Sequence, residues 1–133
     1  MTFLLDTNVC IRYLQGRSQR ILREIQERSP DTLRVCSVVK AELFYGAMKS
    51  NSPATALAKQ REFLDRFGSL PFDDEAARQI GEIRADLARK GTPIGPYDLQ
   101  IAAITRANGL TLVTHNTREF GRVPGLALED WEV

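Results

Sequence analysis

The sequence has little histidine and cysteine, and it has no long apolar run. The chain has one histidine, His115, and two cysteines, Cys10 and Cys36, which are too few for a zinc site. A single histidine also makes a histidine-centred catalytic triad improbable. Both cysteines have apolar neighbours, which favours buried, reduced thiols in an intracellular protein. The apolar runs are far shorter than the ~20 residues of a membrane span, and no basic leader precedes the first of them. We therefore expect neither a membrane helix nor a secretory signal.

The chain also lacks a large excess of charge of one sign. Its 18 lysine and arginine residues are balanced by 17 aspartate and glutamate residues, for a net charge of +1. This balance excludes a histone-like basic protein, so any nucleic-acid-binding surface has to be local. Basic side chains on two helical segments either solvate a surface or, in an RNA-binding protein, contact phosphates. They are Arg17, Arg20, Arg23 and Arg28 on one segment and Arg84, Arg89 and Lys90 on the other.

The composition is that of an ordinary globular protein, with 43% hydrophobic and 26% charged residues among 133. We expect a single domain over residues 1–133. Short apolar runs alternate with longer segments of helical period, which predicts an α/β sandwich with a parallel sheet of four or five strands and helices on both faces. The expected strands are 2–5, 33–36, 69–72 and 110–114, with a short fifth at 126–128. The expected helices are 8–14, 18–28, 37–49 with Ser37 as N-cap, one after the turn at 50–53, 73–90 and 97–107.

Polar side chains gather where ligands bind in such sheets, beyond the carboxyl ends of the strands. Asp6 directly follows the first expected strand, and Asn116 follows the fourth. Glu42 lies in the helix after the second strand, and Asp98 lies at the start of the helix before the fourth. Glu42 and Asp98 fall beside apolar stripes, where a carboxylate is costly unless it is paired or binds a metal. Because Mg²⁺ and Mn²⁺ prefer oxygen ligands, three such carboxylates favour a site for one of these ions.

Each carboxylate also has an ordinary structural interpretation. Asp6 and Asp98 could be helix N-caps, and Glu42 could be a solvated residue at the edge of an amphipathic helix. Asp73 and Asp74 form a second acidic pair, but two acids at a helix start are better explained by the helix dipole.

Several polar neighbours could support the carboxylates. Thr7 and Asn8 follow Asp6 and could hydrogen-bond its carboxylate or a metal-bound water, or could simply begin a helix. Thr114 could do the same from its place beside Asn116. His115 is a weaker candidate for a general base, because strand alternation directs it away from its neighbours.

Four segments, in order and at the same spacing, resemble the PIN-domain ribonucleases. They are residues 4–8 (LLDTN), Ser37 with 41–43 (AEL), 95–103 (GPYDLQIAA) and 113–120 (VTHNTREF). The resemblance spans residues 3–131 and is closer to the VapC toxins of bacterial toxin–antitoxin pairs. Residues 123–126 (VPGL) and 129–131 (EDW) are similar to the VapC subgroup that attacks initiator tRNA.

By this resemblance, Asp6, Glu42 and Asp98 match the metal-binding carboxylates of the family. The resemblance implies that Asp6 and Asp98 hold Mg²⁺, for which Mn²⁺ can substitute. Many PIN domains have a fourth carboxylate where this chain has Asn116. Glu119, or Glu82 from its own helix, is a candidate to complete the acidic site.

The expected activity is metal-dependent hydrolysis of RNA phosphodiester bonds by a cytoplasmic toxin. Water is the nucleophile, so products should carry 5′-phosphate and 3′-hydroxyl ends. The resemblance further implies an initiator tRNA substrate cut in the anticodon loop, a VapB-type antitoxin, a homodimer and a higher assembly with the antitoxin.

Three other functions were compared with this one. A phosphatase of the haloacid dehalogenase type needs a second aspartate at the position of Asn8. A response-regulator receiver needs a phosphorylatable aspartate after the third strand, and Asp73 fits that role poorly. A non-catalytic PIN-fold RNA-binding module is the main alternative, supported only by Asn116.

Overall fold

The sheet consists of five short strands, all parallel. The computed structural model describes all 133 residues, Met1 to Val133. The strands are β1 (Phe3–Leu5), β2 (Leu33–Cys36), β3 (Gly68–Leu70), β4 (Thr111–Val113) and β5 (Ala127–Glu129), in the order β3-β2-β1-β4-β5. Phe3 pairs with Leu33 on one side and with Thr111 on the other, so β1 is the central strand. Every residue of β1 and β4 is buried, as expected for parallel strands covered on both faces.

Seven α-helices connect the strands. They are α1 (Thr7–Gln15), α2 (Gln19–Glu27), α3 (Ser37–Lys49), α4 (Pro53–Leu64), α5 (Asp74–Lys90), α6 (Pro96–Ala107) and α7 (Thr117–Phe120), with a 3₁₀ turn, η1, at Pro30–Thr32. Local sequence signals determine where several of the helices begin and end. The Ser18 side chain caps α2 and Asp73 caps α5. Helices α1 and α5 end at Gly16 and Gly91, whose φ values of 66° and 67° favour glycine.

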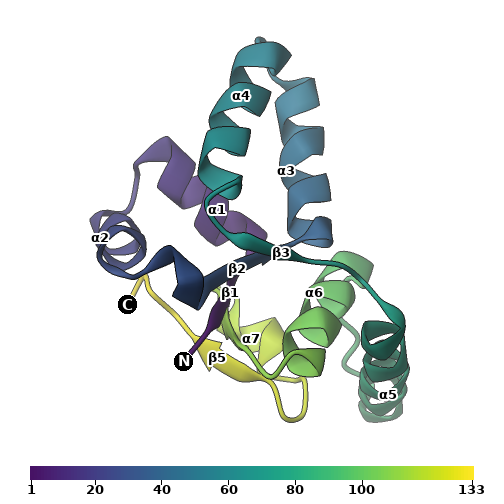
Figure 1. The fold of residues 1–133 in the computed structure, drawn as a ribbon. Helices are drawn as coiled ribbons and strands as arrows, with labels where there is room; N and C mark the ends of the chain where they lie inside the picture. The colour runs from purple at the N-terminus through teal and green to yellow at the C-terminus, as the bar shows by residue number, and fades with distance from the viewer.

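The helices form two layers, one on each face of the sheet. The connections from β1 to β2 and from β2 to β3 step one way across the sheet, whereas the later connections step the other way. Right-handed crossovers therefore place α1 to α4 on one face and α5 to α7 on the other. Figure 1 shows this arrangement, with α3 beside α4 above the strands and α5 beside α6 at the lower right.

A single cluster of 30 buried apolar residues fills the space between the layers. It includes residues from the strands and from α1 to α6, which fixes the ends of the strands relative to the helices that follow them. The Phe3 and Trp131 rings meet edge to face at 5.3 Å, which ties the segment after β5 to the central strand. The sheet edge that carries the polar residues is thus held from both faces.

The predicted fold class is confirmed, and the sheet has five strands. Most elements differ from the expected bounds by one or two residues. Ser37 is the first residue of α3 rather than its cap, and the cap position is Cys36, which makes no side-chain cap bond. Neither η1 nor α7 was predicted, because three or four residues are too short to show a period.

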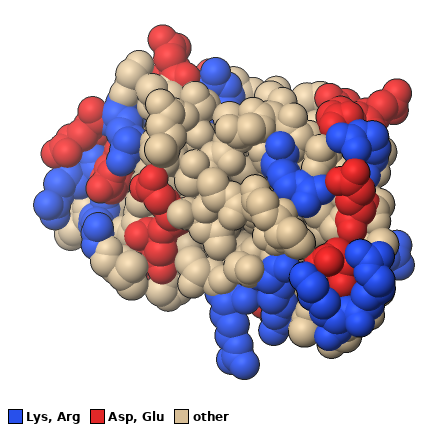
Figure 2. Space-filling view, turned by 90° about the horizontal axis from the view of Figure 1, so that it is seen from below, with Lys and Arg blue, Asp and Glu red and all other residues tan.

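Charges of both signs are mixed on the face seen in Figure 2, around a middle area that carries neither. No field of one sign covers this face, in agreement with the net charge of +1. None of the helices combines the length and apolar character that a membrane crossing requires.

Candidate active site

The point where the strand order reverses lies between β1 and β4. The chain leaves β1 toward one side of the sheet, and it leaves β4 toward the other. Such a reversal opens a crevice at the carboxyl ends of the two strands, where α/β proteins bind ligands. Asp6 directly follows β1, and Thr114 directly follows β4. Sequence order therefore brings these two polar residues to the crevice.

Asp6 is buried and is held by both carboxylate oxygens. The Thr7 backbone N–H donates to Oδ1 at 2.8 Å, and the Thr114 hydroxyl donates to Oδ2 at 2.7 Å. Asp6 is 5% exposed, and burial raises its pKa despite these two bonds, with the charge of Glu42 adding to the rise. Asp6 is thus the N-cap of α1, as one interpretation proposed, and also the carboxylate at the centre of the crevice.

Thr7 connects Asp6 to Glu42. Its hydroxyl donates to Glu42 Oε1 at 2.7 Å, while its backbone N–H donates to Asp6. Glu42 is half-buried on α3, one turn into the helix that follows β2. It is therefore not a freely solvated residue. Of the three residues that could support the carboxylates, Thr7 and Thr114 hydrogen-bond to them, whereas the Asn8 side chain forms no such bond.

Asp98 lies in the first turn of α6 but does not cap it, because Gly95 is at the cap position. Burial raises the pKa of Asp98 to about 6, and the charges of Asp6, Glu42 and Glu119 add to that rise. That the charges of these three residues act on Asp98 agrees with a place for all four carboxylates at the same edge of the sheet. The structure thus brings together three predicted site residues, with Glu119 as a fourth.

Asn116 and Glu119 act as a pair. The Asn116 amide donates to Glu119 Oε2 at 3.3 Å, and its backbone N–H donates to the Thr114 hydroxyl at 3.0 Å. Glu119 lies on α7, the short helix that begins after Asn116. A carboxylate thus lies within hydrogen-bond distance of the Asn116 amide.

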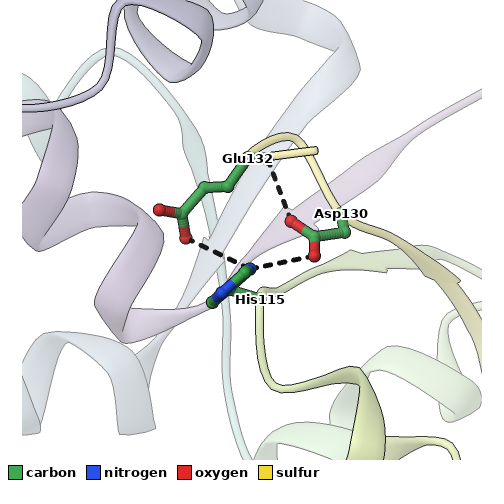
Figure 3. Close-up of side chains that lie close together, drawn as sticks. All are labelled: His115, Asp130 and Glu132. Atoms are coloured by element: carbon green, nitrogen blue, oxygen red, sulfur yellow. Dashed lines mark hydrogen bonds and ion pairs between the residues drawn. The ribbon is translucent and has the colours of Figure 1, made fainter.

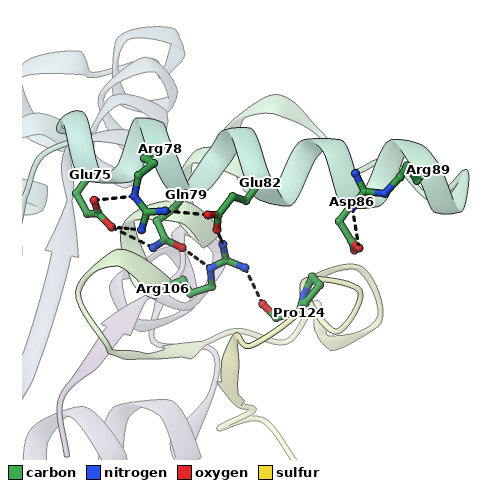
Figure 4. A network of polar contacts seen from close by, with 8 residues as sticks. All are labelled: Glu75, Arg78, Gln79, Glu82, Asp86, Arg89, Arg106 and Pro124. Carbon is green, nitrogen blue, oxygen red and sulfur yellow. Dashed lines mark hydrogen bonds and ion pairs between the residues drawn. The ribbon is translucent and has the colours of Figure 1, made fainter.

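Glu82 is not brought to this group. Its carboxylate accepts from Arg78 at 2.8 Å and from Arg106 at 2.9 Å, on the solvent side of α5. Arg106 is near the end of α6 opposite Asp98, and it also donates to Gln79 and to the Pro124 carbonyl. Figure 4 shows this network, which fastens α5 to α6 and to the segment before β5. These contacts indicate a structural role for Glu82, which is to hold α5 against α6.

A second polar group adjoins the crevice, and of its members only His115 was singled out from the sequence. His115 Nδ1 lies 2.9 Å from Asp130 Oδ2 and 3.7 Å from Glu132 Oε2 (Figure 3). These three residues are the one group of three histidine, cysteine or acidic residues whose ligand atoms lie within 4.8 Å of one another. Their approach depends on the turn after β5, for which the sequence carries no periodic signal.

The two cysteines are free thiols buried behind the site. Burial raises the pKa of Cys36 to about 11 and raises the pKa of Cys10 further. Both thiols are therefore protonated and poor nucleophiles at neutral pH, and they play the packing role predicted for them.

The carboxylate group fits a hard divalent cation. Its donors are all carboxylate oxygens, and no lysine or arginine forms an ion pair with Asp6, Glu42, Asp98 or Glu119. The uncompensated negative charge is what raises the pKa of Asp98 beyond the effect of burial. No three of these carboxylates have ligand atoms that all lie within 4.8 Å of one another, so at most two of them can bind the same ion directly in this geometry. Mg²⁺ is usually held in that way, by one or two carboxylates and several waters.

Comparison with known proteins agrees with this geometry. The PIN domain family matches residues 3–126. The tRNA(fMet)-specific endonuclease VapC of Salmonella typhimurium is 44% identical over 131 residues, covering 98% of each chain. Ribonuclease VapC2 of Rickettsia felis is 35% identical over 133 residues, covering 99% of each. The crystal structure of DNA-bound VapBC from Salmonella typhimurium matches with a TM-score of 0.92 at 43% identity, covering 98% of each chain. The chain therefore belongs to the PIN domain family and, within it, to the VapC ribonucleases.

Proposed function

We propose that this chain is the toxin of a toxin–antitoxin pair and an endoribonuclease that depends on Mg²⁺, with Mn²⁺ as a substitute. The observation that carries the proposal is the group of Asp6, Glu42, Asp98 and Glu119, which lacks any ion-pair partner, at the point where the strand order reverses. Asp6 and Asp98 are the proposed direct ligands. Glu42 and Glu119 complete the negative charge of the site.

The chain's own residues prepare the site for hydrolysis. Thr7 and Thr114 fix both oxygens of Asp6, and Thr7 also fixes Glu42, so the carboxylates are oriented before RNA binds. Asn116 orients Glu119. A divalent cation held there supplies a Lewis acid that activates water and offsets charge on the phosphoryl oxygens. Water adds to phosphorus and the bond to the 3′ oxygen breaks, leaving 5′-phosphate and 3′-hydroxyl ends.

The proposed substrate is initiator tRNA, cut in the anticodon loop. This follows the name of the Salmonella typhimurium relative, a tRNA(fMet)-specific endonuclease, and the similar segment at residues 123–131. A single-stranded loop also suits an open site at a sheet edge, because its bases and backbone are not shielded by a duplex.

The proposed partner is a VapB-type antitoxin, as in the VapBC complexes of Salmonella typhimurium and Rickettsia felis. A homodimer, a higher assembly with the antitoxin and a cytoplasmic location belong to the same proposal. The alternative of a non-catalytic RNA-binding module rests on Asn116, and it weakens because Glu119 lies beside that amide.

The direct test is cleavage by the protein purified free of any partner. Initiator tRNA and a second tRNA are incubated with the protein in Mg²⁺ and in chelator, and the ends of the products are mapped. We expect one cut in the anticodon loop of the initiator, with a 5′-phosphate, and none in chelator. Cleavage that persists in chelator, or binding without cleavage in Mg²⁺, contradicts the proposal.

A further inference from the structure

A polar pocket of about 460 Å³ lies beside the carboxylate group, against α1. We call it the arginine pocket, because Arg12 and Arg17 line it together with His115, Asn116 and Glu132. Only one of its eight lining residues is hydrophobic, so its shape and chemistry do not suit an apolar ligand.

The arginine pocket shares a wall with the carboxylate group. Asn8, which also lines the pocket, comes two residues after Asp6 on the same helix. Asn116 lines the pocket and donates to Glu119. The pocket and the carboxylate group are therefore neighbours on the surface.

The carboxylate group itself repels a polyanion, so RNA needs positive charge nearby. The pocket on the other side of Glu42, formed with Ala41, Tyr45 and Tyr97, contains no lysine or arginine. The arginine pocket contains two. Arg17 forms no ion pair, and it lines the same pocket as Arg12.

The pocket already holds one anion, from the chain itself. Glu132 Oε1 lies 3.2 Å from Arg12 Nε, and Glu132 Oε2 lies 3.7 Å from His115 Nδ1. Asp130 holds Glu132 there by accepting its backbone N–H at 2.9 Å (Figure 3). Carboxylate and phosphate oxygens are recognised by arginine in the same way, so Glu132 marks where a phosphate fits.

Resting on the proposed function, we propose that the arginine pocket binds an RNA phosphate next to the cleaved one, through Arg12 and Arg17, and that Glu132 occupies the pocket until RNA displaces it. The phosphate and the Glu132 carboxylate compete for the same arginine. RNA binding is therefore weakened by Glu132 and strengthened by Arg17.

The test measures binding of a labelled RNA stem-loop, with the sequence of the initiator tRNA anticodon arm, to the full chain in chelator. Four proteins are compared: the parent, Arg17→Ala, Glu132→Gln and the control Arg23→Ala. The loss of Arg23 changes the net charge equally. Arg23 is exposed on α2, forms no ion pair and does not line the pocket, so of the two roles that the sequence left open for it we assign the solvation of the surface. Thermal melts confirm that each variant is folded.

We expect Arg17→Ala to bind the RNA about tenfold more weakly, the loss typical of one charge-assisted contact. The slope of log Kd against the logarithm of the salt concentration should fall by roughly one unit. The Kd of Arg23→Ala should stay within about twofold of the parent's, since an exposed charge away from the bound RNA acts only weakly. Glu132→Gln should bind the RNA about two- to fivefold more tightly, in line with the loss of one partly exposed ion pair.

Equal binding by Arg17→Ala and the parent, or equal loss in Arg23→Ala, overturns the phosphate site. Unchanged or weaker binding by Glu132→Gln overturns the role of Glu132. Because no metal is present, these results are independent of catalysis. A parent that binds through Arg17 but does not cleave in Mg²⁺ contradicts the proposed function and leaves the pocket standing.

Discussion

The Thr114 hydroxyl donates a 2.7 Å hydrogen bond to Oδ2 of Asp6, between residues 108 positions apart in the chain. The same hydroxyl accepts the Asn116 backbone N–H, so it orients the loop after β4 as well as the carboxylate. Thr114 is fully buried, and no water can replace this contact without a change in packing. It is the link between the two strands at whose ends the site is built.

We predict that Thr114→Val lowers RNA cleavage by about 10- to 100-fold, the usual cost of losing a group that orients a metal ligand. Asp6 loses its strongest side-chain partner, although the side-chain volume hardly changes. Thr105→Val is the matched control, because Thr105 is equally buried and its hydroxyl donates only to the Ile101 carbonyl. Cleavage rates and thermal melts of both variants separate the effects. Equal loss of activity in the two would show that Thr114 acts only through stability.

The raised pKa of Asp98 predicts a pH-dependent stability in chelator. Its pKa is about 6 in the fold against an ordinary value of 3.8, so folding favours the protonated form. This contribution is complete below about pH 4 and is lost as pH rises through 6. Asp98→Asn keeps a neutral side chain and should be more stable than the parent by about 1–2 kcal/mol above pH 7, after allowance for solvent screening. Urea unfolding between pH 4 and 7.5 measures the difference, and a constant difference across that range contradicts the prediction.

The roles of Asn116 and Glu119 can be distinguished by the cleavage activity that their variants retain. If Glu119 supplies the fourth charge and Asn116 orients it, Glu119→Gln should lose more activity than Asn116→Ala. Asn116→Asp should keep activity and can tighten metal binding, because it adds a carboxylate at the same place. Cleavage rates at several Mg²⁺ concentrations provide the comparison. The reverse ranking would assign the main role to Asn116.

Glu82 provides a contrast among the acidic residues. Its carboxylate is bound by Arg78 and Arg106 on the exposed side of α5, so Glu82→Gln should change cleavage by less than about twofold. A loss as large as that of Glu119→Gln would show that Glu82 reaches the RNA or the metal. The two variants make the same chemical change, so their cleavage rates can be compared directly.

The fold could be predicted because its main signals are local. Strands β1, β2 and β4 are short apolar runs, and helices α2 and α5 begin at capping residues that the sequence displays. Asp6, Glu42 and Asp98 could be placed at one edge because parallel strands all end there. The place of each residue in the sequence relative to the strands was enough to predict this grouping, without knowledge of any side-chain contact.

The remaining features depend on contacts between distant segments. The interaction of Glu82 with Arg106 joins residues 24 positions apart on separate helices, so sequence reasoning could not separate Glu82 from the acidic group. The approach of Asp130 and Glu132 to His115 is set by an irregular turn after β5, which has no period to detect. The arginine pocket depends on that same turn, since it supplies Glu132.

The most direct test of the proposed metal site is a set of four thermal melts, of the parent and Asp98→Asn, each in Mg²⁺ and in chelator. At free Mg²⁺ about 100 times its dissociation constant, one-site binding should stabilise the parent by about 2.7 kcal/mol, a shift of several degrees in Tm. Asp98→Asn should gain little, because it lacks one of the two proposed ligands. An equal gain in both proteins would contradict the assignment and place the ion elsewhere, with His115, Asp130 and Glu132 as the first alternative.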